Sequence, residues 1–554
     1  MKKNILIKGL MGVVLAGSMV SCSEDYLNTE PQMGISAGDV YATVDAARKG
    51  MYGVCRGMYN QWQGMDQGFN GEAFISNFYG ETAGQDFYEY YWSYIGWNDQ
   101  MTLDFAQVTD YKMCNYAWAY AYTLIGQAND VLGGIDTAEG DAQERNFVKA
   151  QLLTLRAHAY WRLLQVYAPR WIDSNEGNTE CIVMRLEPTT GDAPLVTMKA
   201  VLDQMYADLN LAIELFENSG SIKRSFGWEP DLSVCYGTYA RLALLKDDWA
   251  TAQEMANKAR ANYPIMTADE YQAGFNMPNN EWMWYSSGEL ADEIYYWAHG
   301  VIYACNGYYA CNQPIGAGAI NIDTYRQIPE GDIRRNLYLT EDKVSSFGAD
   351  KWYDPELISE VSISPKDDKV NTRNLRSIRN WAATLPQVAE HGFSMPYTAA
   401  DVAESSGTIW QLGAQFKYWC LDTRGRGYVS FMRGAEMLLT EAEAAYHNDD
   451  EGTAKRLLEE LNAQRNENYT CTVSGQALLD EIRFYRRIEL LGEGFNWYDF
   501  KRWNLPIERR AWVANDPTSG NYPIVDAKVV PVDAAKGWRY AVPKSETDYN
   551  DAIK

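Results

Sequence analysis

The sequence predicts a mainly α-helical protein, in which tetratricopeptide-like helix pairs form a scaffold that carries a loop-rich, aromatic-rich layer. Two observations predict this fold class. Small and apolar residues recur at helical spacing in blocks on either side of a long central stretch, and one block fits a known repeat length. The central stretch is rich in Gly, Asn, Pro and aromatic residues and has no sustained helical period, which is typical of loops and short strands.

The first residues are typical of an export signal that ends in a lipidated cysteine. Three lysines precede a short apolar run, and small Ser21 stands directly before Cys22. The run is too short to span a bilayer. It resembles a bacterial lipoprotein signal, so residues 1–21 are expected to be removed and Cys22 to carry lipids that anchor the chain without crossing the membrane. The alternative is a plain secreted protein.

Charge and cysteine content limit the partners of the chain. The net charge of −25, without a stripe of Lys and Arg, disfavours nucleic acid as a ligand. Nine cysteines stand at irregular spacing, with no C-x-x-C pair for zinc or redox chemistry. A disulfide between Cys305 and Cys311 fits the spacing, but free buried thiols are favoured because a large core needs no covalent links.

The helical blocks can be placed in order along the chain. Residues 233–266 fit the tetratricopeptide unit of about 34 residues. Such a helix pair buries its apolar face only against another pair, so further helices are expected. They are placed at 111–132 with 150–167, at 198–216, and at 431–446 with 451–466.

These elements are expected to form one domain over residues 22–554, because no linker rich in Pro, Ser or Gly divides the chain. The helical scaffold is placed at about 105–265 and 428–503. A loop-rich, ligand-binding layer is placed at about 53–100 and 279–427.

Four stretches, in the right order, resemble the SusD/RagB family of surface lipoproteins. They are 22–31, 118–132 with 155–164, 432–446, and 482–503, which reads IRFYRRIELLGEGFNWYDFKRW and is the most specific. Phe495-Asn496 departs from the basic or His residue that usually follows Glu-Gly. The resemblance implies a protein that captures nutrients, usually oligosaccharides, and passes them to a SusC-like TonB-dependent transporter. Glu24 and Asp25 resemble the tag that sends Bacteroidota lipoproteins to the outer face of the outer membrane.

Aromatic residues supply the candidate ligand contacts. Flat rings stack on the C–H faces of pyranose rings, while Asn and Asp side chains bind the hydroxyls. The densest aromatic runs lie at 87–99, 282–285 and 295–297. The alternative for each ring is packing within the core of the loop layer. The candidates are Asp66, Trp92, Tyr94, Trp97, Asn98, Asp99, Trp284 and Tyr296.

A catalytic interpretation rests on Glu489 and Glu493, which stand four apart and would share one helix face like an acid/base pair. A general acid needs a raised pKa, and neighbouring guanidinium groups lower it. A structural ion-pair network is therefore favoured, with nearby aromatic residues as packing. Its expected cations are Arg483, Arg486, Arg487, Lys501 and Arg502.

No cofactor is predicted. Four scattered histidines form no H-E-x-x-H motif, and His158 is expected to be a packed residue of a helix. Paired aspartates, such as Asp449-Asp450, offer oxygen ligands for calcium, but a solvated loop explains them without a metal.

The sequence thus predicts a non-catalytic, lipid-anchored protein of the outer membrane that binds oligosaccharides. A peptide-binding member of the same family and an all-helical glycoside hydrolase are the alternatives.

Overall fold

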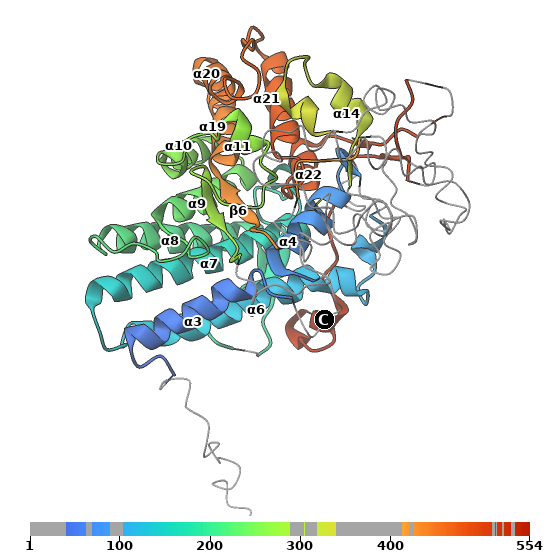
Figure 1. Cartoon of the computed structure of the whole chain (residues 1–554). Helices are drawn as coiled ribbons and strands as arrows, with labels where there is room; N and C mark the ends of the chain where they lie inside the picture. Colours follow the sequence, from blue (N-terminus) through green and yellow to red (C-terminus); the bar gives the residue numbers. More distant parts are fainter. Residues whose placement is uncertain are drawn as a thin grey trace, which may run out of the picture.

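The computed structural model describes residues 40–61, 69–88, 103–189, 191–288, 304, 318–338, 413–419, 426–511, 513, 516, 518–522, 526–532 and 538–553. These residues form a stack of helices that rises from α3 to α20 and α21, with shorter elements beside it (Figure 1). In this part of the chain no helix is long and apolar enough to cross a membrane.

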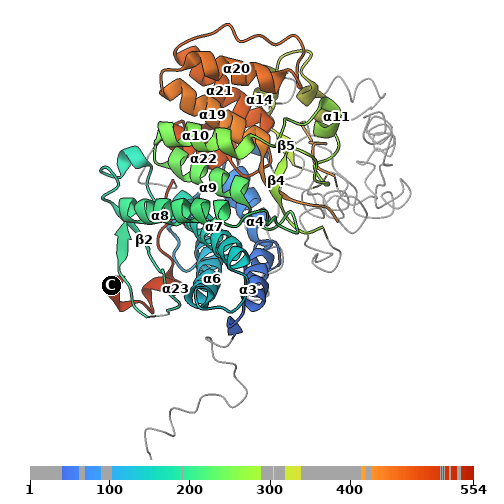
Figure 2. The same cartoon turned by 90° about the vertical axis from the view of Figure 1, so that its left-hand side faces the viewer.

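The long helices follow one another through the stack in chain order (Figure 2). They are α3 (Val44–Gly57), α6 (Lys112–Ile135), α7 (Ala142–Tyr167), α8 (Met198–Glu217), α9 (Leu232–Leu245), α10 (Trp249–Arg260), α19 (Gly434–His447), α20 (Glu451–Asn462) and α21 (Gln476–Glu489). Each packs on the next, and α10 packs on α19 although residues 261–433 separate them in the chain. The predicted scaffold of stacked helix pairs is confirmed.

Side-chain caps fix where these helices begin. An oxygen of each cap accepts a hydrogen bond from a backbone N–H of the first turn, which would otherwise lack a partner. The caps of α3, α7, α8, α9, α10 and α20 are Thr43, Asp141, Thr197, Asp231, Asp248 and Asp450. Small side chains then allow close approach, since Ala243, Ala252 and Ala444 join α9, α10 and α19 in one buried cluster.

The turns of two helix pairs are alike. Residues 247–252, which lead from the turn after α9 into α10, read Asp-Asp-Trp-Ala-Thr-Ala. Residues 449–454, which lead from the turn after α19 into α20, read Asp-Asp-Glu-Gly-Thr-Ala. The first aspartate of each turn has a positive φ, +57° at Asp247 and +60° at Asp449. The second aspartate caps the following helix. The two pairs are therefore copies of one local design.

The sequence did not predict α3, and two further segments differ from the sequence-based expectation. The helix expected from residue 431 begins at Gly434, because strand β6 (Ser430–Arg433) precedes it and pairs with β4 (Trp282–Tyr285). Residues 71–82, expected as loop, form α4 (Gly71–Phe74) and the π-helix η2 (Ile75–Thr82). Tertiary contacts hold this second segment. Buried Glu72 binds Arg162 at 2.6 Å and lies 2.9 Å from Nε2 of His158, which confirms His158 as a packed residue.

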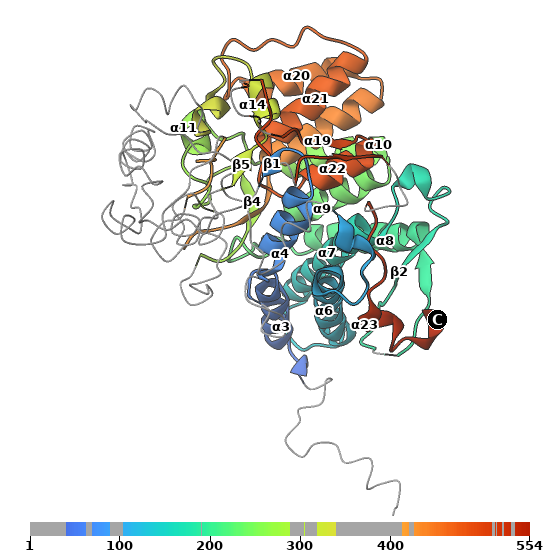
Figure 3. The same ribbon diagram turned by 90° about the vertical axis from the view of Figure 1, so that its right-hand side faces the viewer.

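Short elements lie beside the stack, with α11, α14, β4 and β5 on one side of it (Figure 3). The other two-stranded antiparallel sheets pair β1 (Phe87–Tyr88) with β5 (Ala319–Ile320), β2 (Glu180–Val183) with β3 (Leu195–Thr197), and β7 (Ile507–Glu508) with β8 (Val529–Val530). The short helices are η3 (Asp104–Gln107), η4 (Trp171–Asp173), α11 (Ala268–Tyr271), α14 (Ile322–Gln327), η6 (Ile333–Leu337), α22 (Asn496–Trp503), α23 (Lys544–Thr547) and η9 (Asp551–Ile553).

The last residues return to the first helices of the stack. The N–H of Tyr540 donates to the carbonyl of Val166 at 3.0 Å, and that of Ala541 to Ala106 at 2.8 Å. Trp118 of α6 donates from Nε1 to Glu546 at 3.2 Å. Helix α23 therefore lies beside α6 (Figures 2 and 3).

Five cysteines within the described residues are buried free thiols, as favoured: Cys55, Cys114, Cys181, Cys235 and Cys471. Cys305 and Cys311 lie outside the described residues.

Candidate ligand-binding site

Glu489 and Glu493 do not share a helix face. Glu489 is the last residue of α21, and Glu493 lies in the turn that follows. Both carboxylates bind Arg433, Glu489 through Nη1 at 3.1 Å and Glu493 through Nε at 2.6 Å. The acid/base geometry that their spacing suggested is therefore absent from this pair.

The electrostatics of these carboxylates also disfavour acid catalysis. Burial alone would raise the pKa of Glu489, but the guanidinium groups of Arg465, Arg433 and Arg334 outweigh it and hold that pKa well below its usual range. For Glu493, Arg433 and Lys417 likewise overcome burial and lower the pKa. The predicted ionised network is confirmed.

The cations of this network differ from the expected ones. Arg334, Arg433 and Arg465 come from segments far from Glu489 in the chain. The basic residues near Glu489 have other partners, since Arg486 binds Asp499 at 2.7 Å and Arg487 binds Asp86 at 2.6 Å. The aromatic residues of α22 are buried, which confirms their role in packing: Trp497, Tyr498, Phe500 and Trp503.

This network holds the base of a cleft beside β4. Glu281 accepts from Nη1 of Arg433 at 2.7 Å through Oε1, and from the N–H of Met266 at 2.7 Å through Oε2. Glu281 directly precedes Trp282, the first residue of β4. The buried carboxylate therefore fixes Met266 and Trp282, two residues of the cleft wall.

We call this hollow the aromatic cleft. It has a volume of about 1030 Å³, including space open to solvent, and lies beside α11 and β4. Its walls combine aromatic rings with amide, carboxylate and guanidinium groups. The lining residues are Met266, Glu270, Ala273, Phe275, Asn276, Met277, Pro278, Asn279, Trp282, Trp419 and Arg426.

Backbone contacts set the positions of the rings. The N–H of Trp419 donates to the carbonyl of Gly274 at 3.0 Å, and Nδ2 of Asn276 donates to the carbonyl of Trp419 at 2.6 Å. Gly274 has a φ of +93°, and a Cβ there would lie 2.1 Å from Nε1 of Trp419. Glycine is therefore needed for Trp419 to pack at this point.

The chemistry of the cleft suits a ring with hydroxyl groups. The rings of Phe275 and Trp282 lie 6.4 Å apart between centroids and line the cleft, with 8% and 3% of their residue surface exposed. Nε1 of Trp282 is buried and makes no hydrogen bond within the described residues, so it is an available donor. Met277 and Asn279 lie at the more open edge.

The structure tests one of the predicted contact residues. Trp284 is 0% exposed, its ring packs on His158 and Phe431, and its Nε1 donates to the carbonyl of Trp228 at 2.8 Å. It is a core residue, which corrects its assignment as a ligand contact. Seven other candidates lie outside the described residues, as does Cys22: Asp66, Trp92, Tyr94, Trp97, Asn98, Asp99 and Tyr296.

Sequence reasoning missed Phe275, Asn276 and Trp419. A signal was present, because residues 274–279 read Gly-Phe-Asn-Met-Pro-Asn, an aromatic residue among turn-forming residues. Seven residues separate this hexapeptide from the repeat unit at 233–266, and all of the hexapeptide except Asn279 lies outside the ranges assigned to the loop layer.

Comparisons with known families place this fold. A model described as "SusD family" matches residues 416–554. A second, described as "Starch-binding associating with outer membrane", matches residues 56–244. The two segments do not overlap, and together they take in more than half of the chain. No curated protein sequence matches it.

Solved structures share the whole architecture. A SusD-like carbohydrate binding protein from Bacteroides vulgatus is 21% identical, with a TM-score of 0.69 over 93% of this chain and 98% of that chain. A SusD superfamily protein from Bacteroides thetaiotaomicron is 16% identical, with a TM-score of 0.66 over 92% and 99%. Surface glycan-binding protein A from the same species, in complex with laminarihexaose, is 15% identical, with a TM-score of 0.61 over 92% and 98%.

The fold therefore defines a tetratricopeptide-like helical protein of the SusD-like class. The chain belongs to the SusD/RagB family.

Proposed function

We propose that this chain is a non-catalytic lipoprotein of the outer membrane that binds oligosaccharides and delivers them to a SusC-like TonB-dependent transporter. The aromatic cleft is the observation that carries the ligand class, because Phe275, Trp282 and Trp419 join amide and carboxylate groups around one hollow. The relatives named above as carbohydrate-binding or glycan-binding support the same class.

The proposal also includes a lipid anchor at Cys22 and a transporter as the partner. Cys22 receives the lipids after residues 1–21 are removed, and the single domain of residues 22–554 faces the cell exterior. The description "associating with outer membrane" for the matched family supports this location. Replacement of Cys22 by Ala should move the chain from the membrane fraction to the soluble fraction. Retention in the membrane would contradict lipid anchoring.

Binding is tested by calorimetry with residues 23–554, which include every residue that the structure describes. The chain is titrated with a panel of plant, microbial and host oligosaccharides that includes laminarihexaose, and reducing ends are assayed in the same samples. We expect saturable binding to at least one glycan without new reducing ends. New reducing ends would contradict a non-catalytic role, and binding to peptides alone would contradict the ligand class.

Variants then locate the site. Trp282→Phe and Met277→Ala should each weaken binding by about 3- to 10-fold, because each removes ring or side-chain contact in the cleft. Phe226→Ala is the matched control, since Phe226 is an exposed aromatic residue that does not line the cleft. Trp92→Ala and Trp97→Ala test the earlier candidates in the same assay. If the two cleft variants and the Trp92→Ala and Trp97→Ala variants all bind as tightly as the Phe226→Ala control, the site lies elsewhere.

A further inference from the structure

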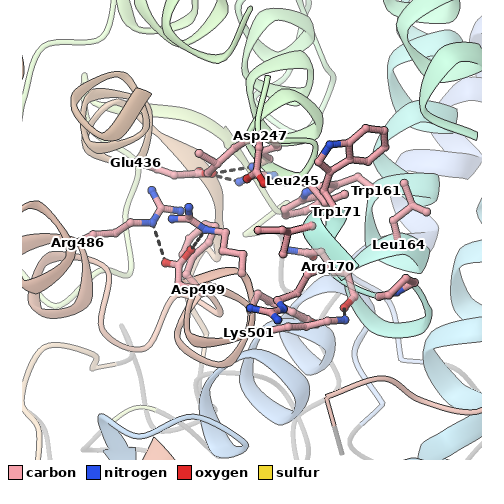
Figure 4. A pocket seen from close by; sticks show the side chains of 18 residues that line it. Trp161, Leu164, Arg170, Trp171, Leu245, Asp247, Glu436, Arg486, Asp499 and Lys501 are labelled. Atoms are coloured by element: carbon pink, nitrogen blue, oxygen red, sulfur yellow. Dashed lines mark hydrogen bonds and ion pairs between the residues drawn. The ribbon is translucent and has the colours of Figure 1, made fainter. Parts of the chain in front are cut away.

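A second pocket lies within the helical stack, where the C-terminal ends of α7 and α9 meet α22 (Figure 4). We call it the helix-side pocket. Its volume is about 670 Å³, including space open to solvent, and it shares no lining residue with the aromatic cleft. Figure 4 shows the Arg486–Asp499 ion pair on one side of it and the rings of Trp161 and Trp171 on the other.

The charged groups of its walls are already paired with one another. Arg241 binds both oxygens of Glu436 at 2.7 Å. Asp499 binds Arg486 at 2.7 Å and Arg502 at 2.8 Å. These pairs fix the walls in place and cancel most of their charge. The pocket is thus rigid and close to neutral.

Lys501 closes the lower edge of the pocket without adding much charge. Its Nζ donates to the carbonyls of Gln165 and Ala168, at 2.8 Å each, and so ties α22 to the end of α7. Burial and the neighbouring Arg539 and Arg170 lower the pKa of Lys501 to about 7.

Two buried donors in the wall have no partner in the described part of the chain. They are Nη1 of Arg241 and the hydroxyl of Tyr498. The two residues are only 3% and 5% exposed, so bulk water does not solvate them. An unpaired buried polar atom is costly, and its presence in a built wall points to a bound acceptor.

One acceptor in the wall is also unused. Asp247, in the turn after α9, lines the pocket, and no hydrogen bond or ion pair engages its carboxylate among the described residues. Burial and nearby Glu443 raise its pKa to about 6, although Arg502 and Arg170 oppose this. Asp247 also has a positive φ. The structure thus holds a carboxylate here at some cost.

An aromatic wall completes the pocket. Trp171 is half-buried, and its ring rests on Gly177, where a Cβ would come within 2.5 Å of Cζ3. Trp161 is not free for stacking, because the guanidinium groups of Arg162 and Arg241 lie 4.4 and 4.6 Å from its ring centroid. Trp171 is more open, because it is only half-buried and the nearest cation, Nζ of Lys246, lies 5.9 Å from its ring centroid.

We propose that the helix-side pocket is a second ligand site, which takes one neutral, hydroxylated ring such as a single pyranose. Arg241 and Tyr498 donate to hydroxyl oxygens, Asp247 accepts from a hydroxyl, and Trp171 packs on the ring. A carboxylate ligand would meet Asp247, and a cationic ligand would meet the two unpaired donors. Hydroxyl groups serve both, because they donate and accept. This site does not depend on the oligosaccharide site proposed above.

The test uses ligand-observed saturation-transfer NMR on residues 23–554. The probes are the methyl pyranosides of glucose, galactose and mannose, with xylitol as an acyclic control and glucuronate as a charged one. All measurements are made in the Trp282→Phe background, which weakens binding at the aromatic cleft, and the pocket variants below separate the binding that remains at the cleft from binding at the pocket. We expect saturable binding of at least one methyl pyranoside and weaker signals from xylitol and glucuronate.

Two variants assign that binding to the pocket. Tyr498→Phe and Asp247→Asn should each weaken it at least fivefold. Asp449→Asn, the matching change in the exposed turn between α19 and α20, should leave it unchanged. Thermal melts are recorded for all three variants to check that each is folded. The proposal is overturned if no methyl pyranoside saturates, if glucuronate alone binds, or if the two pocket variants bind like Asp449→Asn. None of these outcomes alters oligosaccharide binding at the aromatic cleft, which calorimetry reports separately.

Discussion

The turns between α9 and α10 and between α19 and α20 have the same pattern and different surroundings. In both, the first aspartate has a positive φ and the second accepts a hydrogen bond from a threonine N–H, at 3.3 Å for Asp248 and 3.0 Å for Asp450. The two copies touch, since the ring of Trp249 stacks on His447 at 4.0 Å. The shared sequence pattern thus goes with the same backbone conformation and the same cap in both turns.

Their surroundings set the chemistry. Asp449 is exposed to solvent, whereas Asp247 is half-buried on the wall of the helix-side pocket. One repeated turn thus serves as plain surface in one copy and as part of a candidate site in the other. A repeat can acquire a ligand site through what covers it, without a change in its own backbone.

The largest expected effect comes from breaking the link between the two copies. Arg241 of α9 and Glu436 of α19 form a buried ion pair. Glu436→Ala leaves the Arg241 charge buried without its partner, which should cost about 3–5 kcal/mol of unfolding free energy. Urea denaturation measures this loss. Glu254→Ala, which removes an exposed pair with Lys258, should change it by less than about 0.5 kcal/mol. Equal losses would refute the link.

The helix caps test whether the turns are equivalent. Asp248→Ala should cost about 1 kcal/mol, because it leaves an N–H at the start of α10 unpaired. Asp248 also accepts a hydrogen bond from the hydroxyl of Tyr206 at 3.2 Å. Among the described contacts, Asp450 has no such second hydrogen bond from a side chain. We therefore expect a smaller fall in Tm for Asp450→Ala. A larger fall would reverse this ranking.

The first aspartates should differ in their pH dependence. The pKa of Asp247 is raised from 3.8 to about 6 by burial, so the folded state disfavours its ionised form. Stability is therefore lost as pH rises through this range, and Asp247→Asn should restore about 1 kcal/mol above pH ~6.5 and nothing below pH ~3.5. The figure is reduced for partial exposure.

Melting temperatures measured from about pH 3.5 to pH 8 check this difference. Asp449→Asn, in the exposed turn, serves as the control and should show a flat profile. Parallel profiles for the two variants would mean that the surroundings do not separate the two turns.

The smallest effect is expected at the hydroxyl of Tyr498, near the first turn. Because this buried hydroxyl has no partner among the described residues, Tyr498→Phe should not lower the unfolding free energy and should raise it by up to about 1 kcal/mol. Tyr167 is the comparison, since its hydroxyl donates to the carbonyl of Cys114 at 2.7 Å and accepts from the N–H of Trp118 at 2.9 Å. Tyr167→Phe should cost about 1–3 kcal/mol. A large loss for Tyr498→Phe would reveal an unrecognised partner.

The sequence was sufficient to predict most of the scaffold, because helical spacing and repeat length are local signals, but it did not predict α3. It did not predict the partners of Glu489, since these arginines meet only through long-range packing. Trp282 and Trp284 show the same limit. Alternation in a regular strand would put both on one face, but the register shifts between them. Trp282 consequently joins the cluster of Phe275, and Trp284 joins the helical core.

The return of the C-terminal residues to α6 and α7 affects how the chain can fold during synthesis. Trp118 and Val166 bind residues that are made more than 370 positions later, at 546 and 540. During synthesis the N-terminal part of a chain leaves the ribosome first, so α6 and α7 emerge long before these partners. The helices that are synthesised first are thus among the last to gain all their contacts. A chain that lacks the final residues should form the rest of the stack but leave apolar surface of α6 and α7 exposed.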